Sequence, residues 1–205
     1  MTGIKLCGLT RLCDMEAANE LKPEYIGFVF AAKSRRYVTP EQAAGLRQAL
    51  DPAILAVGVF VNEDPERVAE LLNEGIIDLA QLHGNETETY IKRLRQLTKK
   101  PLIQAFSVDS AQAVMQAQES TADYILLDSG RGGTGTVFDW DFLKQIKRPY
   151  FFAGGLDIGN VAEAVERFHP YAVDVSSGIE TDGVKDREKM RQFVTIVRSG
   201  RRETR

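Results

Sequence analysis

The chain has few of the residues that build disulfide frameworks or zinc centres. Its 205 residues include only two cysteines, Cys7 and Cys13, and two histidines. Two cysteines close together near the start, with so few histidines, do not match a disulfide scaffold or a zinc site. We therefore expect no metal site and no disulfide, and we expect a reducing compartment, the cytoplasm.

Long apolar runs and an excess of positive charge are also missing. No stretch of about 18 apolar residues is present, and the first residues lack the apolar core of a secretory signal. The formal net charge is −3, so no overall positive field would attract nucleic acid or acidic membranes. The sequence predicts no nucleic-acid partner and no membrane association. The basic end, residues 199–205, is expected to be a flexible, solvated tail.

Short apolar segments alternate with longer amphipathic segments along the chain. Hydrophobic residues make up 43% and charged residues 27%, as in ordinary globular proteins. The apolar segments are mostly uninterrupted, which is typical of parallel strands buried on both faces. The expected strands are 4–7, 25–30, 55–61, 79–82, 102–106, 124–128, 150–153 and 172–175.

Helix start signals lie between these strands. In the clearest case, Thr39 precedes Pro40, and Gln42 follows three positions after Thr39, which predicts a capping box. Similar signals lie at 62–66, 85–88, 109–111, 157–160 and 186–188, and a helix of barely two turns is expected over 141–146.

Eight strand–helix units at a spacing near 25 residues favour a single (β/α)₈ TIM barrel, with eight parallel strands and outer helices, over residues 1–198. The alternative is a doubly wound open sheet, which normally uses fewer strands. In both folds the chemistry belongs at the carboxyl ends of the strands.

Two glycine- and serine-rich turns follow the last two expected strands. Gly154 and Gly155 follow the seventh strand, and Ser176 and Ser177 follow the eighth. Glycines let backbone N–H groups approach an anion, and loops at these two positions hold phosphate in many barrels. The pair of turns therefore predicts a phosphate site, although each alone could be a tight turn. Neither turn matches a nucleotide fingerprint.

Cys7 and Asp128 each stand at the carboxyl end of an expected strand. Cys7 is interpreted either as a small core residue or as a general base, and the base role calls for a thiol pKa below the ordinary value of about 8.5. Lys5, on the same face, is either the source of positive charge for that purpose or half of a structural ion pair. Asp128 is either a turn cap or a general acid, and the glycine-rich segment 129–135 after it would allow closure over a ligand.

Three further polar residues follow or end expected strands. Arg36 could hold a substrate carboxylate with its guanidinium fork, or could be solvated. Asp174 could accept a hydrogen bond from a ligand amino group, and His83 could touch the ligand or only support the pocket. Cys13, in the first expected helix, is assigned a structural role, and Trp140 is expected to pack at the rim of the barrel.

Over nearly its whole length the sequence resembles the phosphoribosylanthranilate isomerase family. The matching blocks, in order, are Lys5-Leu6-Cys7-Gly8-Leu9-Thr10, Ser34-Arg35-Arg36-Tyr37, Gly58-Val59-Phe60-Val61-Asn62, Gln81-Leu82-His83-Gly84, Leu127-Asp128-Ser129, Gly132-Gly133-Thr134-Gly135, Phe138-Asp139-Trp140, Ala153-Gly154-Gly155-Leu156 and Asp174-Val175-Ser176-Ser177-Gly178-Ile179-Glu180.

The resemblance implies a (β/α)₈ barrel that catalyses the Amadori rearrangement of N-(5-phosphoribosyl)anthranilate in tryptophan biosynthesis. It implies that Cys7 is the general base and Asp128 the general acid. Arg36 and Asp174 would contact the anthranilate moiety, with His83 beside them. The phosphate would be held by Gly154, Gly155, Ser176 and Ser177. No cofactor is required, because the substrate nitrogen acts as the electron sink.

Other functions remain open at this stage. The Amadori isomerase of histidine biosynthesis has a carboxylate in the position of Cys7, and indole-glycerol-phosphate synthase has a longer N-terminal extension. A non-catalytic phosphate-binding barrel would tend to lose the acid or the base. We expect a small phosphosugar substrate as the partner and a monomer or homodimer as the assembly.

Overall fold

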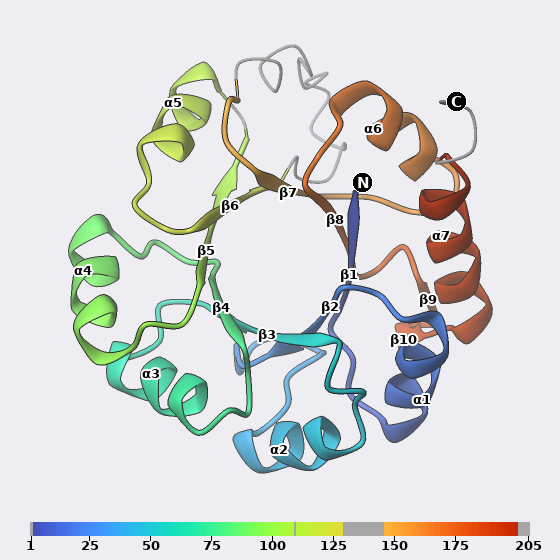
Figure 1. Cartoon of the computed structure of the whole chain (residues 1–205), viewed down its shortest axis with the longest axis horizontal. Helices are drawn as coiled ribbons and strands as arrows, with labels where there is room; N and C mark the ends of the chain where they lie inside the picture. Colours follow the sequence, from blue (N-terminus) through green and yellow to red (C-terminus); the bar gives the residue numbers. More distant parts are fainter. Residues whose placement is uncertain (1, 109, 129–145, 201–205) are drawn as a thin grey trace.

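The computed structural model describes residues 2–108, 110–128 and 146–200. Eight parallel strands form a closed barrel in sequence order, and the barrel closes where β1 pairs with β8 (Figure 1). The barrel strands are β1 Gly3–Cys7, β2 Tyr25–Val29, β3 Leu55–Phe60, β4 Leu79–Leu82, β5 Leu102–Ser107, β6 Tyr124–Asp128, β7 Tyr150–Ala153 and β8 Ala172–Val175. The predicted barrel is confirmed, and four of the eight predicted strands have the same bounds.

The helices surround the barrel and cover its outer face (Figure 1). Within the described residues they are α1 Leu12–Leu21, α2 Pro40–Gln48, α3 Pro65–Asn73, α4 Glu88–Leu97, α5 Ala111–Glu119, α6 Val161–Phe168 and α7 Arg187–Ser199. The predicted capping box of α2 is present, because Thr39 Oγ1 accepts from Gln42 N at 3.2 Å and Gln42 Oε1 accepts from Thr39 N at 2.9 Å. The helix expected over 141–146 falls almost entirely outside the described residues.

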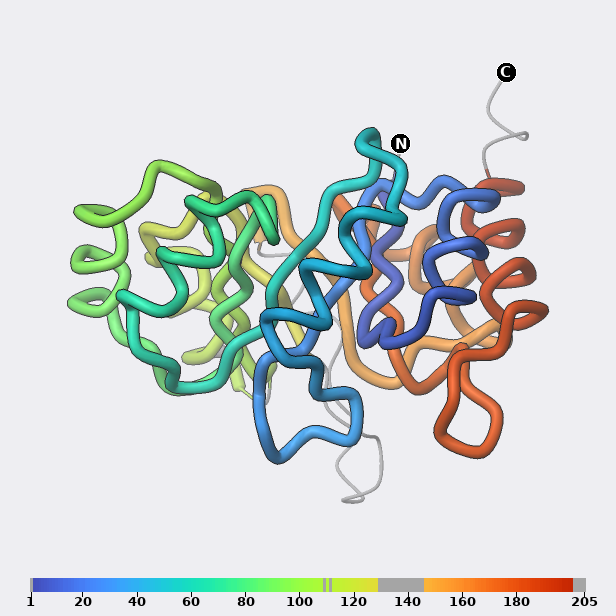
Figure 2. Tube along the Cα trace, turned by 90° about the horizontal axis from the view of Figure 1, so that it is seen from below, coloured from blue at the N-terminus to red at the C-terminus, as the bar shows by residue number. Residues whose placement is uncertain are grey.

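A short antiparallel hairpin follows β8, and the sequence did not predict it. Its strands are β9 Glu180–Thr181 and β10 Val184–Lys185. Figure 2 shows this hairpin and the loop after β2 extending from one end of the barrel, opposite the end at which the chain begins. These two segments therefore project on the side where the strands end.

The core has one layer outside the barrel and one inside. Along β1, Ile4 and Leu6 are buried in the cluster shared with the helices, so Lys5 and Cys7 point into the barrel. Along β6, Leu126 belongs to the inner cluster, so Asp128, two residues later, points inward as well. Burial on both faces explains why the strands appear in the sequence as uninterrupted apolar runs.

The inner layer ends in polar side chains at the carboxyl ends of the strands. Below them, one or two apolar residues from each of β2 to β8 fill the barrel. This inner cluster consists of Tyr25, Val57, Leu79, Ile103, Leu126, Phe151, Ala153 and Ala172. The apolar filling leaves the carboxyl end of the barrel as the place where a ligand can meet Cys7 and Asp128.

Candidate active site

Lys5 and Asp174 form an ion pair inside the barrel. They are register partners on β1 and β8, and Lys5 Nζ lies 2.7 Å from Asp174 Oδ2. Lys5 is fully buried, and the side chain of Asp174 is 7% exposed. Asp174 Oδ1 is buried as well and has no hydrogen-bond partner within the described part of the chain. The structure thus contains the ion pair that was one of the two interpretations of Lys5, and it leaves one carboxylate oxygen for a further donor.

Cys7 lies two residues after Lys5 on β1, on the same face of the strand, and is buried. Burial raises the pKa of its thiol and Asp174 adds to the rise, whereas the positive charges of Lys5 and Lys185 oppose it. The net direction is upward, whereas the base role calls for a lowered thiol pKa. The space for the sulfur comes from Gly27 on β2, where a Cβ atom would lie 2.7 Å from Cys7 Sγ.

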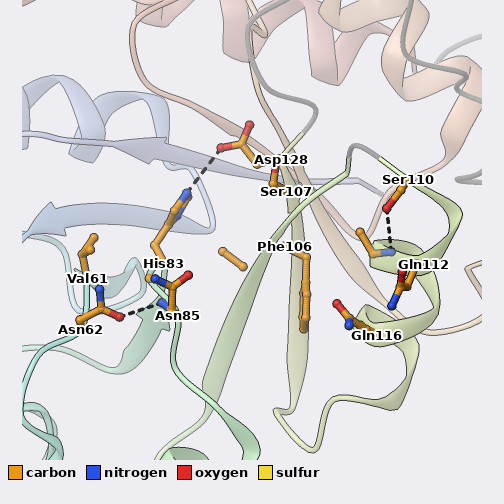
Figure 3. Close-up of a pocket in the computed structure, with 13 residues that line it drawn as sticks. Val61, Asn62, His83, Asn85, Phe106, Ser107, Ser110, Gln112, Gln116 and Asp128 are labelled. Atoms are coloured by element: carbon orange, nitrogen blue, oxygen red, sulfur yellow. Dashed lines mark hydrogen bonds and ion pairs between the residues drawn. The ribbon is translucent and has the colours of Figure 1, made fainter. Parts of the chain in front are cut away.

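Asp128 lies across the barrel mouth, in contact with His83. His83 Nε2 lies 3.5 Å from Asp128 Oδ2 (Figure 3). On the other side of the ring, His83 Nδ1 lies 2.8 Å from Gln81 Nε2. If the Gln81 amide donates to Nδ1, the ring proton sits on Nε2 and faces the carboxylate. His83 is therefore placed to orient Asp128, which fits the supporting role considered for it.

A cavity of about 780 Å³ opens next to this pair. Its walls come from the ends of β3, β4, β5 and β6 and from the start of α5 (Figure 3). The lining residues are Val61, Asn62, His83, Gly84, Asn85, Ala105, Phe106, Ser107, Ser110, Gln112, Ala113, Gln116 and Asp128. Cys7 is not among them, so this cavity forms only the acid side of the mouth.

The two glycine- and serine-rich turns lie against each other. Asp157 and Gly178 pair as a parallel bridge, and a Cβ atom on Gly178 would come within 1.9 Å of the Leu156 carbonyl oxygen. Gly154 and Gly155 have φ angles of 96° and 65°, which glycine adopts without strain. The turns therefore form one continuous backbone surface, as a shared phosphate site requires.

The serines in the second turn differ in their surroundings. Ser177 is exposed, whereas Ser176 Oγ donates to the Cys7 carbonyl oxygen at 3.1 Å and lies 3.2 Å from Lys185 Nζ. The hydroxyl of Ser176 thus links the end of β8 to the end of β1. Its predicted phosphate contact would have to use its backbone N–H or share this hydroxyl.

Arg36 reaches the same end of the barrel from the loop after β2. Its Nε donates to Glu180 Oε1 at 2.6 Å and its Nη2 donates to Glu180 Oε2 at 2.8 Å. The guanidinium expected to hold a substrate carboxylate thus already holds one from the protein. Neither Glu180 nor Lys185 was predicted as a site residue. The only sequence signal was the Glu180 position at the end of the last matching block.

Other predicted features lie away from this site or outside the described residues. Cys13 lies in α1, the first helix, and is exposed. Trp140 and the glycine-rich segment 129–135 fall outside the described ranges, as do residues 201–205 of the basic end. In residues 2–108, 110–128 and 146–200, no group of three or more His, Cys, Asp or Glu side chains could hold a metal ion. No helix in the same ranges is long and apolar enough to cross a membrane.

The sequence matches known proteins over nearly its full length. Residues 4–196 match the family model for N-(5'phosphoribosyl)anthranilate (PRA) isomerase. The N-(5'-phosphoribosyl)anthranilate isomerase of Endomicrobium trichonymphae is 44% identical, covering 97% of this chain and 100% of the relative. The enzyme of the same name from Clostridium acetobutylicum is also 44% identical, covering 97% of this chain and 98% of its own.

Solved structures agree with these sequence matches. The phosphoribosyl anthranilate isomerase of Thermotoga maritima superposes with a TM-score of 0.88 at 33% identity, covering 97% of this chain and 100% of that one. A second structure superposes with a TM-score of 0.85 at 32% identity, over 97% and 100% of the two chains. It is a phosphoribosyl anthranilate isomerase in complex with reduced 1-(o-carboxyphenylamino)-1-deoxyribulose 5-phosphate.

Proposed function

The chain belongs to the N-(5'-phosphoribosyl)anthranilate isomerase family, and we propose that Cys7 and Asp128 are the general base and general acid of its reaction. The enzyme converts N-(5-phosphoribosyl)anthranilate into 1-(2-carboxyphenylamino)-1-deoxyribulose 5-phosphate in tryptophan biosynthesis. The reaction is an internal redox isomerisation, so the site has to move protons and hold the substrate at both ends.

Asp128 gives its proton to the furanose ring oxygen. The C1′–O4′ bond then breaks while the anthranilate nitrogen forms a C1′=N iminium with its lone pair. His83, 3.5 Å from Asp128, holds the carboxyl toward the barrel mouth. General acid catalysis of this kind contributes typically about 10²–10⁴-fold.

Cys7, as thiolate, removes the proton from C2′ of the iminium. The electrons of the C–H bond form the C1′=C2′ double bond and neutralise the nitrogen, which gives an enolamine. This enol becomes the ketone when C1′ takes a proton and the C2′ hydroxyl loses one. Lys5 and Lys185 both carry positive charge close enough to oppose the upward shift of the Cys7 pKa, so they favour the thiolate when it forms.

The two ends of the substrate meet different groups at the mouth of the barrel. The adjoining turns at Gly154, Gly155, Ser176 and Ser177 receive the phosphate, and Arg36 receives the ring carboxylate. Asp174 Oδ1, buried without a partner in the described residues, accepts the anilino N–H. Holding both ends aligns C2′ with the sulfur and the ring oxygen with Asp128.

The observation that supports these roles best is the alternation of side chains in the strands. Cys7 and Asp128 each stand two residues after an inward-facing residue of the same strand, and each ends its strand at the same end of the closed barrel. A base on β1 and an acid on β6 can therefore act on one sugar.

The test of function is the loss of fluorescence of N-(5-phosphoribosyl)anthranilate when the purified chain is added. We expect turnover without added metal or cofactor, and abolition of turnover in the Cys7→Ala, Asp128→Asn double variant. Turnover in that variant equal to the parent would overturn the proposed roles.

We further propose a cytoplasmic enzyme that works as a monomer or homodimer on this one small substrate. Support for a reducing compartment comes from the two free thiols, Cys7 and Cys13. Sedimentation of the purified chain distinguishes the two assemblies.

A further inference from the structure

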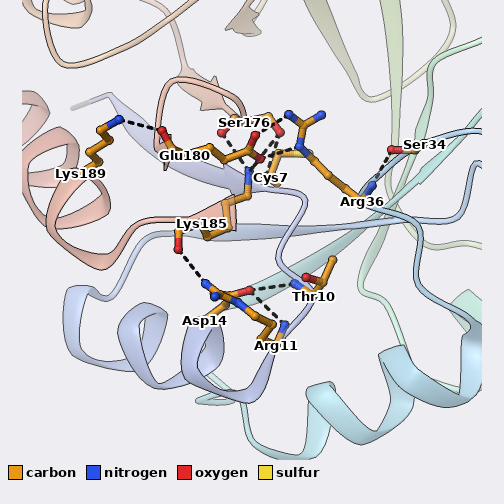
Figure 4. A network of polar contacts seen from close by, with 10 residues as sticks. All are labelled: Cys7, Thr10, Arg11, Asp14, Ser34, Arg36, Ser176, Glu180, Lys185 and Lys189. Atoms are coloured by element: carbon orange, nitrogen blue, oxygen red, sulfur yellow. Dashed lines mark hydrogen bonds and ion pairs between the residues drawn. The ribbon is translucent and has the colours of Figure 1, made fainter. Parts of the chain in front are cut away.

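Glu180, the first residue of β9, is a buried carboxylate between two cations. Its side chain is 7% exposed. It accepts from Arg36 through both oxygens, at 2.6 and 2.8 Å, and Lys185 Nζ donates to its Oε1 at 2.6 Å. Figure 4 shows Arg36 and Lys185 meeting at Glu180, with Cys7 and Ser176 beside them. Glu180 therefore joins the loop after β2 to the hairpin that follows β8.

The contacts of Glu180 use only one edge of the Arg36 guanidinium. A guanidinium carries five N–H groups, one on Nε and two on each terminal nitrogen. Glu180 takes the Nε edge, which consists of Nε and one N–H of Nη2. The outer edge, formed by Nη1 and the second N–H of Nη2, has the same fork geometry and can bind a second carboxylate.

The aliphatic part of the Arg36 side chain, here called the stem, is held in place as firmly as the guanidinium group. A Cβ atom on Gly8 would lie 2.4 Å from Arg36 Cδ, so the stem packs directly on the backbone next to Cys7. The Arg36 N–H donates to Ser34 Oγ at 3.1 Å. The aliphatic part of Arg36 packs on Gly8, and its Nε edge is bound to Glu180. These two contacts fix the orientation of the outer edge, close to the sulfur of Cys7.

The hairpin that carries Glu180 is itself held in place. Lys189 Nζ on α7 donates to the Glu180 carbonyl oxygen at 2.7 Å, and Arg11 Nη2 donates to the Lys185 carbonyl oxygen at 2.7 Å (Figure 4). Lys185 Nζ also donates to the Ser176 carbonyl oxygen at 2.9 Å. Glu180 is thus a fixed point, and Arg36 is the group that it orients.

The charges in this cluster leave one positive charge uncompensated. Arg36 and Lys185 contribute two positive charges and Glu180 one negative charge. Burial alone would raise the pKa of Glu180, but the hydrogen bonds from Arg36 and Lys185 lower it, so Glu180 stays ionised. The cluster can therefore accept one more carboxylate without losing its own.

We propose that Glu180 is a positioning residue that presents the outer edge of the Arg36 guanidinium to the ring carboxylate of the substrate. This inference rests on the proposed function, in which Arg36 binds that carboxylate. It assigns to Glu180 the selectivity for an anthranilate over an aniline, although Glu180 itself does not touch the substrate.

The experiment measures competitive inhibition by two compounds in the parent, Glu180→Gln, Arg36→Ala and the double variant. One compound is reduced 1-(o-carboxyphenylamino)-1-deoxyribulose 5-phosphate, and the other is the same molecule without the ring carboxylate. Glu188→Gln is the matched control, because Glu188 also pairs with an arginine but its side chain is 54% exposed on α7.

We expect Glu180→Gln to weaken the carboxylated inhibitor about tenfold, the size of one well-oriented charge-assisted hydrogen bond. Binding of the compound without the carboxylate should stay within about twofold, which also shows that the variant is folded. In the Arg36→Ala background, Glu180→Gln should add no further loss, because it acts through Arg36. Glu188→Gln should change neither inhibitor.

Equal weakening of both inhibitors, or a full additional loss in the Arg36→Ala background, would overturn the positioning role. So would an unchanged affinity of Glu180→Gln for the carboxylated compound while Arg36→Ala loses it. If Arg36→Ala itself binds both compounds as the parent does, the failure lies in the carboxylate site of the proposed function.

Discussion

Lys5 Nζ and Asp174 Oδ2 lie 2.7 Å apart inside the barrel, although the two residues are 169 positions apart in the sequence. Burial would lower the pKa of Lys5, but Asp174 and Cys7 raise it, and the net direction is upward. Lys5 is therefore a cation beside Cys7 at neutral pH. The pair keeps a fixed positive charge near the sulfur while Asp174 limits its strength.

The first prediction concerns the pH dependence of Cys7. Burial raises the pKa of the thiol above its ordinary value of about 8.5, and the reactive form is the deprotonated one. Alkylation of Cys7 by iodoacetamide, measured in a Cys13→Ser background, should therefore increase with pH and reach half its plateau above about pH 8.5. The value of kcat/KM should rise with pH in the same direction.

Removal of the Lys5 charge should move this alkylation curve to still higher pH. The Lys5→Met variant lacks a charge that opposes the rise of the Cys7 pKa, but it leaves Asp174 buried without its cation, which costs about 3–5 kcal/mol of stability. Circular dichroism therefore has to confirm folding first. A folded Lys5→Met protein with an unchanged or lower midpoint would contradict the electrostatic role of Lys5.

The second prediction is that Cys7→Ala lowers kcat at least about a hundredfold. Affinity for the reduced product analogue should be nearly kept, because Cys7 acts on C2′ and does not anchor either end of the substrate. Cys13→Ala is the matched control, since Cys13 is exposed on α1, and it should be as active as the parent. Near-parental turnover by Cys7→Ala would remove the sulfur from the mechanism.

The third prediction is that Asp128→Asn lowers kcat by a similar factor of about a hundred, because an amide cannot donate the acidic proton. His83→Asn should lower kcat less, by about tenfold, because it only loosens the orientation of Asp128. Stopped-flow turnover measures both. A His83 variant more impaired than the Asp128 variant would transfer the acid role to the imidazole.

The fourth prediction tests the contact between the turn after β7 and the turn after β8. Gly178→Ala would place a Cβ atom 1.9 Å from the Leu156 carbonyl oxygen and force the two turns apart. We expect the free energy of unfolding to fall by about 1–3 kcal/mol, and inhibition by inorganic phosphate to weaken.

Gly45→Ala on α2 is the control for that substitution. Nothing lies within 4 Å of a Cβ atom at Gly45, and alanine should stabilise the helix by about 0.5–1 kcal/mol. Urea unfolding and phosphate inhibition measure both variants. Parental phosphate inhibition by Gly178→Ala would separate phosphate binding from the contact between the turns.

The sequence predicted best those features that are formed by residues close to one another along the chain. The capping box at Thr39 was predicted correctly, because its parts lie within four residues. The β9–β10 hairpin was missed, because its strands have two residues each and two residues show no periodicity. The direction of the Cys7 pKa shift could not be read from the sequence, because it depends on the balance between burial and the charges of Lys5 on its own strand, Asp174 on β8 and Lys185 on β10.

The sequence by itself determined the barrel and the strand-end positions of Cys7 and Asp128, because uninterrupted apolar runs specify parallel strands that are buried on both faces. Only the tertiary structure decided the partners at the site. Arg36 meets Glu180 across 144 positions of sequence, and Lys5 meets Asp174 only because the barrel closes between β1 and β8. Such pairings depend on three-dimensional register, which no local pattern encodes.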